Sequence, residues 1–241
     1  MSATVWPLST GAQTKAPAVA DLSQSARPVY DLFVAPVIAV LVMAGLAVFS
    51  AERRIAWLHV PSKPLTTALL FLIVGWPTTR LAWWIDAGIA LSIVGDVALL
   101  SSSKPAFLAG LGAFLLAHLA YVVAFAPLAV WSPHVAIVAV ATLTVTALVL
   151  RAIWTGAAGL QAPTIAYGVV ISAMVIAASA TLGGPLAAAP LAAAGATFFY
   201  ASDASLALNR FRRPIPHAAF FTLGLYWIGQ IGIALSARGG Y

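Results

Sequence analysis

The stretch GATFFYASDASLALNRFRRP, residues 195–214, places an acidic side chain, Asp203, deep inside an apolar run of helical length. Such a run is typical of a membrane-spanning helix, which needs about 20 mostly apolar residues. A carboxylate is costly in the hydrocarbon core of a bilayer, so an intramembrane acid is by default a candidate functional residue. Asp203 therefore requires a partner, a reaction or a transported proton to account for its position.

The whole chain has the composition of a membrane protein. Of its 241 residues 62% are hydrophobic and 7% are charged, whereas a soluble domain has roughly 25% charged residues, and the mean hydropathy is +1.01. We predict an all-α membrane protein, a bundle of about eight transmembrane helices within residues 30–241, preceded by a flexible polar tail over residues 1–29. The expected spans are 30–50, 64–79, 82–101, 105–126, 134–152, 163–181, 186–208 and 216–237.

Composition and motifs exclude several classes of function. The net charge is +6, but the basic residues lie at the ends of apolar runs and form no stripe, so we expect no nucleic-acid partner. The chain has no cysteine and no close His/Glu spacing, so we expect neither a metal nor another cofactor. The serine-hydrolase elbow GxSxG and the phosphate-binding loop are absent as well.

The spans contain a weak internal repeat. GDVALL at 95–100 corresponds to SDASLAL at 202–208, four spans later. The helices that follow these two segments also correspond, with His118 in the first and Gln230 in the second, and spans two and six both open beside a proline. This pattern favours two parallel four-helix halves.

The repeat places two acids at similar depth on helices that run in the same direction. Asp96 lies in the last third of span three and Asp203 at a similar depth in span seven. Other polar residues fall in the same half of the membrane, and several are spaced three or four residues apart and so share a helix face. These supporting candidates are Lys63, His118, Tyr121, Tyr167, Tyr200, Tyr226 and Gln230.

Each candidate also has a structural interpretation. The aspartates could be buried hydrogen-bonding groups that hold helices together, and His118 could bridge two helices. Lys63 could be an ordinary basic residue at the end of a span. We interpret Asp86, which stands beside two tryptophans near a helix start, as an interfacial residue.

Several motifs, in this order and spacing, resemble the YhhN/TMEM86 family of integral membrane proteins over essentially the whole chain after the tail. They are SKPL at 62–65, GDVALL at 95–100, GLGAFLLAHLAYVVAF at 110–125, Tyr167 with Gly168, and SDASLALNRF at 202–211. Members with an assigned activity are lysoplasmalogenases, which hydrolyse the vinyl ether bond of lysoplasmenyl phospholipids to a fatty aldehyde and a glycerophospho-base. The resemblance implies that Asp96 and Asp203 form the catalytic centre, with Asn209 of the last motif among the supporting residues.

The implied partners are a lysophospholipid substrate and membrane lipids, and we expect a multi-pass protein of the bacterial inner membrane whose oligomeric state is open. Vinyl ether hydrolysis needs an acid, a water-activating base and stabilisation of an oxocarbenium ion. One protonated and one ionised carboxyl group supply all three, although the sequence does not say which aspartate is which. Lys63 and the arginines at 210, 212 and 213 could hold the phosphate. A proton-coupled transporter of a small or lipid-like solute that uses the same aspartates is the alternative.

The distribution of basic residues predicts that both termini lie outside the cytoplasm. The turns after spans one, three, five and seven hold eight Lys or Arg residues and the other side holds four, and cytoplasmic loops are the ones enriched in these residues. A reporter fused after Tyr241 should therefore be active as a phosphatase and dark as a fluorescent protein. A cytoplasmic C-terminus would show that the span count or the charge assignment is wrong.

Overall fold

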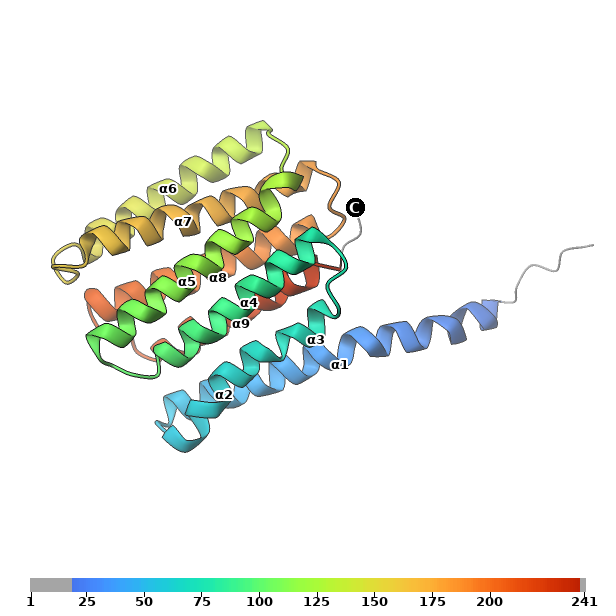
Figure 1. The fold of residues 1–241 in the computed structure, drawn as a ribbon, viewed down its shortest axis with the longest axis horizontal. Helices are drawn as coiled ribbons and strands as arrows, with labels where there is room; N and C mark the ends of the chain where they lie inside the picture. Colours follow the sequence, from blue (N-terminus) through green and yellow to red (C-terminus); the bar gives the residue numbers. More distant parts are fainter. Residues whose placement is uncertain (1–18, 239–241) are drawn as a thin grey trace, which may run out of the picture. The chain divides into compact units, whose positions relative to one another are not determined.

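The computed structural model describes the backbone of residues 19–238 and the side chains of residues 34–238. This part of the chain is built from helices and turns and contains no strand, which confirms the predicted fold class (Figure 1). The helices are α1 (Val19–Glu52), α2 (Ala56–Ala68), α3 (Leu70–Val74), α4 (Arg80–Ala98), α5 (Lys104–Phe125), α6 (Pro133–Ile153), α7 (Gln161–Ala180), α8 (Ala189–Phe211) and α9 (Ala218–Ser236), with short 3-10 turns at Ala126–Leu128 and Thr181–Gly183.

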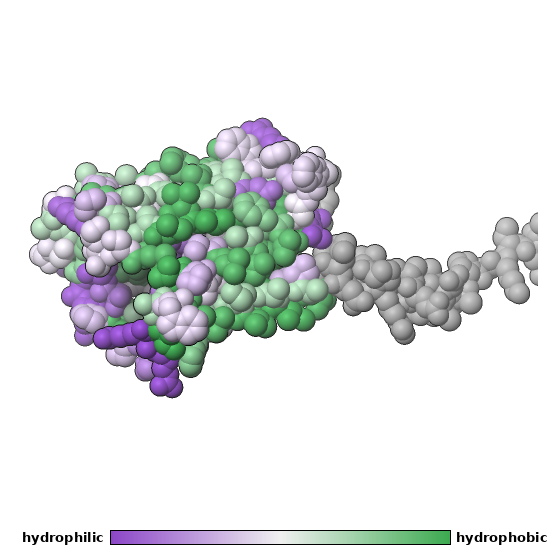
Figure 2. Space-filling model, turned by 60° about the horizontal axis from the view of Figure 1, so that its bottom comes forward, coloured by the Kyte–Doolittle hydropathy of each residue, from purple (hydrophilic) through white to green (hydrophobic). Residues whose placement is uncertain are grey.

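Eight segments of the described chain are long and apolar enough to cross a membrane. Val34–Glu52 of α1 is the first, and α2 and α3 together form the second, Ala56–Val74. Figure 2 shows hydrophobic residues across the middle of one face and hydrophilic residues gathered toward its ends. This distribution is that of a multi-pass integral membrane protein, whose helices meet lipid in the middle and headgroups at their ends.

The first helix begins earlier than the sequence predicts. α1 starts at Val19, whereas the predicted span started at residue 30. The stretch 20–26 includes alanine, leucine and glutamine, which favour helix, so the loss of apolar residues ends the span without ending the helix. Residues 1–18 lie outside the described residues, and the flexible tail stays a prediction there. The chain divides into the units Met1–Ala35 and Pro36–Tyr241, and the candidate site lies wholly within the second.

The second span also begins earlier, at Ala56 instead of residue 64. Pro61 and Pro64 lie inside α2. Proline removes a helical hydrogen bond, so these two residues in the sequence indicated that the helix starts after them. Membrane helices tolerate proline where neighbouring helices satisfy the freed backbone groups. Lys63 consequently lies within the helix and is buried, so the charge bias used for orientation is seven basic residues against four, since Lys63 no longer counts as a loop residue.

Close approaches hold together the two hairpins that surround the site, α4 with α5 and α8 with α9 (Figure 1). A Cβ atom added to Gly229 would lie 2.6 Å from the backbone nitrogen of Phe199, so the backbones of α8 and α9 touch there. A Cβ atom on Gly95 would lie 2.6 Å from the ring of Phe114, so α5 packs its ring directly on α4. Small residues at helix interfaces allow such contacts in membranes.

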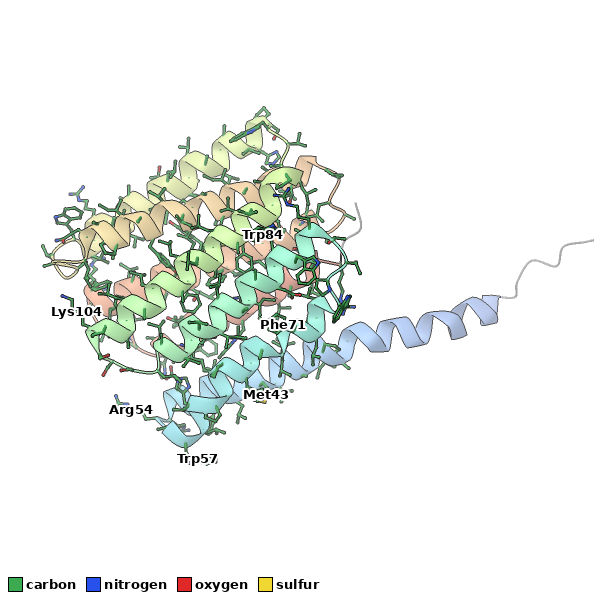
Figure 3. All side chains as sticks on the ribbon, in the orientation of Figure 1. Met43, Arg54, Trp57, Phe71, Trp84 and Lys104 are labelled. Atoms are coloured by element: carbon green, nitrogen blue, oxygen red, sulfur yellow. The ribbon has the colours of Figure 1, made fainter. Side chains whose placement is uncertain are left out.

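One end of the bundle is basic. The ends of α1, α4, α6 and α8 and the starts of α2, α5, α7 and α9 lie there (Figure 1), and Figure 3 shows Arg54 and Lys104 at this end with Trp84 toward the opposite one. We call it the basic end, after Arg53, Arg54, Lys104, Arg151, Arg210, Arg212 and Arg213. Because α4 ends at Ala98 and α8 at Phe211, both aspartates of the repeat lie in the half of the bundle nearer the basic end.

Candidate active site

Three side chains hold the carboxylate of Asp96, which is 1% exposed in the last turn of α4. Its Oδ2 atom accepts hydrogen bonds from the hydroxyls of Thr67 at 2.5 Å and Tyr226 at 3.0 Å. The ammonium of Lys63 lies 3.3 Å from Oδ1. Lys63 and Thr67 are four residues apart on α2 and so share one helix face. A buried charge is tolerated when it is paired and hydrogen-bonded in this way.

A polar network behind Asp96 directs these hydroxyls toward it. The Gln230 amide nitrogen donates to the Tyr226 hydroxyl at 3.4 Å, and Gln230 Oε1 accepts from Tyr121 at 2.7 Å. Trp227 donates its indole N–H to the Thr67 hydroxyl at 3.3 Å. The Thr67 and Tyr226 hydroxyls thus each accept a hydrogen bond from a residue of α9. Each can therefore donate its own proton to the Asp96 carboxylate.

Asp203 has a different environment. Its Oδ2 accepts a hydrogen bond from the Tyr167 hydroxyl of α7, and His118 Nε2 of α5 lies 3.6 Å away, beyond hydrogen-bond distance. His118 is fully buried, and within residues 34–238 neither of its ring nitrogens has a hydrogen-bond partner. Its ring packs 4.7 Å from that of Phe199 and edge-on to Tyr167 at 5.2 Å. The Asp203 side chain is 13% exposed and thus more accessible than Asp96.

Both aspartates line one cavity of about 260 Å³ near the basic end, between α2, α4, α5, α8 and α9; we call it the polar cavity. Its polar lining consists of Lys63, Asp96, Ser101, Ser102, Ser202, Asp203, Arg210, Thr222 and Tyr226. A second hollow, between α5, α6, α7 and α8, is lined mainly by hydrocarbon and meets the polar cavity at Asp203; we call it the apolar groove. Asp203 is therefore placed where a polar space and an apolar space join.

Two residues of the predicted site lie elsewhere. The Tyr200 hydroxyl bonds to Thr146 Oγ1 at 2.8 Å and lines the apolar groove without touching either carboxylate. Asn209 accepts the backbone N–H of Ile215 at 2.8 Å and so closes the turn between α8 and α9. Asp86, interpreted as interfacial, lines neither space.

Thr67, the closest donor to Asp96, was not among the residues predicted from the sequence. Its spacing of four residues from Lys63 was the available signal, but the prolines of α2 placed this segment at the margin of the predicted span. Within residues 34–238 no group of three or more His, Cys, Asp or Glu side chains could hold a metal ion.

The contacts of the two aspartates correspond to each other. Each carboxyl group accepts a hydrogen bond from a hydroxyl on the preceding span. The donor is Thr67 of α2 for Asp96 and Tyr167 of α7 for Asp203. Each is also approached by a helix of the other proposed half, since Tyr226 comes from α9 and His118 from α5. Two parallel halves related by an axis along the membrane normal would produce this exchange, although the division into halves stays a prediction.

Comparison with known proteins gives the family. A family model described as YhhN family matches residues 58–237 of the chain. The chain belongs to the YhhN family. Human lysoplasmalogenase TMEM86B is 31% identical over 188 residues, which cover 77% of this chain and 78% of that protein. The mouse protein of the same name is 29% identical over 175 residues, covering 73% and 72%, and no solved structure matches.

In this member of the YhhN family we predict that Lys63→Met is more destabilising than the double change Lys63→Met with Asp96→Asn. Removing one partner of a buried ion pair costs about 3–5 kcal/mol because it leaves an uncompensated charge, whereas replacing both partners avoids that cost. Thermal unfolding of detergent-solubilised variants measures the order of stability. Lys104→Met, an exposed lysine at the same end, is the control and should match the unchanged protein. Equal stability of the single and double variants would contradict the pairing.

Proposed function

We propose that this protein is a membrane-embedded hydrolase that cleaves the vinyl ether bond of lysoplasmalogens, such as lysoplasmenyl-ethanolamine or lysoplasmenyl-choline, to a fatty aldehyde and a glycerophospho-base. The observation that supports this most directly is the pair of carboxyl groups in different environments on one cavity inside the membrane-spanning bundle. The names of the TMEM86B relatives agree with this reaction.

In this mechanism Asp96 is the ionised carboxylate. It is next to the Lys63 ammonium and accepts from two hydroxyls whose protons point toward it, and an ionised carboxylate is an acceptor at both oxygens. Its fixed negative charge can stabilise positive charge that develops elsewhere in the polar cavity, as preorganised groups do in enzyme active sites.

Asp203 is the protonated carboxyl group and the acid. Among residues 34–238 only the His118 ring lies within ion-pair distance of it, and Tyr167 supplies one donor to Oδ2. Its proton goes to the alkene carbon that is not bonded to oxygen, and the π electron pair forms the new C–H bond. The positive charge then lies on the carbon bonded to the ether oxygen, as an oxocarbenium ion, while Asp203 becomes a carboxylate.

The remaining steps use one water molecule. Water adds to the oxocarbenium carbon and gives a proton to the Asp203 carboxylate, which restores the acid. The resulting hemiacetal breaks its bond to the glycerol oxygen, which takes the hemiacetal hydroxyl proton, and the aldehyde and the alcohol are released. General acid–base steps of this type need the carboxyl groups within reach of the reacting atoms, as two groups on one cavity wall are.

Arg210 is the better placed residue for the substrate phosphate. The Lys63 ammonium is occupied by Asp96, whereas Arg210 is exposed, lines the polar cavity and lies over the Phe107 ring at 4.8 Å. Guanidinium groups bind phosphate in a bidentate manner, and stacking on a ring limits their motion. Lys63 thus acts on Asp96 and only secondarily on the phosphate.

Asp96→Asn and Asp203→Asn should each lower kcat by at least about a hundredfold, the lower range for general acid–base catalysis. Asp86→Asn makes the same carboxyl-to-amide change on α4, but Asp86 lines neither the polar cavity nor the apolar groove. It is therefore the matched control and should retain activity. The measurement is aldehyde release from lysoplasmenyl-ethanolamine by purified protein in detergent, with folding checked by size-exclusion chromatography. Retained activity in both central variants would refute the mechanism.

The same assay separates the hydrolase from a transporter. Hydrolysis needs no sealed compartment, so detergent-solubilised protein should release aldehyde. Substrate-dependent proton flux in sealed vesicles, with no aldehyde from any vinyl ether lipid in micelles, would instead identify a proton-coupled transporter that uses the two aspartates.

A further inference from the structure

Apart from Asp203 and its partner Tyr167, the residues that line the apolar groove have no role in the proton transfers described above. It is lined by residues of α5, α6, α7 and α8 in the half of the bundle nearer the basic end. Its lining includes the aliphatic side chains of Leu111, Val149, Leu150 and Ile171 and the small residues Ala204 and Ala207. Along α8 it extends from Tyr200 to Phe211, which is about 16 Å at the helical rise of 1.5 Å per residue.

The groove and the polar cavity share a boundary. Leu99, Phe107, Phe114, Asp203, Leu206 and Arg210 line both spaces. The polar cavity holds Lys63, Asp96 and several hydroxyls, whereas apolar atoms form most of the groove wall. A molecule that fills both spaces would be charged at one end and hydrocarbon at the other. Asp203 is the one carboxyl group among the six shared lining residues, so the join between the two parts of such a molecule can lie beside it.

We propose that the apolar groove binds the hydrocarbon chain of the lipid substrate and selects it by length and shape. This proposal rests on the proposed function, because a lysoplasmalogen has its vinyl ether bond between the phosphate-bearing glycerol and the chain. With the headgroup in the polar cavity and the chain passing into the apolar groove at Asp203, the scissile bond lies next to the group that donates the proton. The geometry accounts for the position of the acid at the join.

The selection is steric and not hydrophobic. In a micelle or bilayer the chain is already surrounded by hydrocarbon, so moving it into the groove removes little apolar surface from water. What the groove adds is a fixed position, which holds the alkene near Asp203, and a limit on volume. Narrowing the groove should therefore penalise long chains more than short ones.

The test uses one narrowing variant from each wall and a matched control. Ala207→Phe narrows the groove from α8, and Val149→Trp narrows it from α6, so that either can decide the question if the other fails to fold. Ala194→Phe makes the same change as the first variant on an exposed part of α8 outside the groove. Aldehyde release is measured for octadecenyl and octenyl lysoplasmenyl-ethanolamine at equal mole fraction in mixed micelles.

We expect both narrowing variants to lower kcat/KM for the octadecenyl lipid by about tenfold more than for the octenyl lipid, because an added bulky side chain excludes the longer chain first. Ala194→Phe should keep the chain preference of the unchanged protein. If both narrowing variants affect the two chains equally, or leave both unchanged, the chain does not lie in the groove and the proposal is wrong.

A binding measurement separates failure of this proposal from failure of the proposed function. The saturated octadecyl ether lysophospholipid has no alkene to protonate, and a ligand that binds the folded state raises its unfolding temperature whether or not it reacts. It should raise the unfolding temperature of the unchanged protein and of Ala194→Phe more than that of the narrowing variants. If this difference is found but no lipid yields aldehyde, the hydrolase is rejected and the chain site is kept. If the lipid raises the unfolding temperature of all four proteins equally, the chain site is rejected.

Discussion

The burial of the Asp96 carboxylate is the constraint on which the rest of the structure depends. An isolated charge in this position would cost several kcal/mol, so the chain must bring an ammonium and hydroxyl donors to it from other helices. Lys63 and Thr67 of α2 and Tyr226 of α9 do this, and each contact fixes the position of a helix around α4. The proline-containing start of α2 follows from the same need, since it places Lys63 inside the bundle instead of in a loop.

The difference between the two aspartates arises from what surrounds them. Helices α4 and α8 bring both carboxyl groups to one cavity, but within residues 34–238 only Asp96 has a cation and a network of oriented donors behind it. Asp203 faces the Tyr167 hydroxyl and the fully buried ring of His118. Two like groups in unlike environments can take opposite parts in acid–base chemistry, and the position of Asp203 between a polar and an apolar space suits an amphiphilic substrate.

Much of the fold could be predicted because membrane spans are defined by long apolar runs, and the all-α architecture is confirmed. The start of helix α1 and the start of the second span could not, since polar residues and prolines interrupt an apolar run without ending a helix. Matched depth on parallel spans indicated that Asp96 and Asp203 share a site, and the structure brings both to one cavity. Spacing alone did not show which side of a helix faces the cavity, so Tyr200 and Asn209 were included and Thr67 was missed.

Proton transfer to the alkene carbon is the central claim, and product analysis in D2O tests it most directly. Purified protein is incubated with lysoplasmenyl-ethanolamine in D2O, the aldehyde is reduced at once to the alcohol to prevent exchange, and the product is analysed by mass spectrometry. We expect a fatty alcohol with a single deuterium on the carbon next to the former carbonyl, formed more slowly than the product in H2O. Recovery of no fatty alcohol, or of alcohol without that deuterium, would contradict the proposed chemistry.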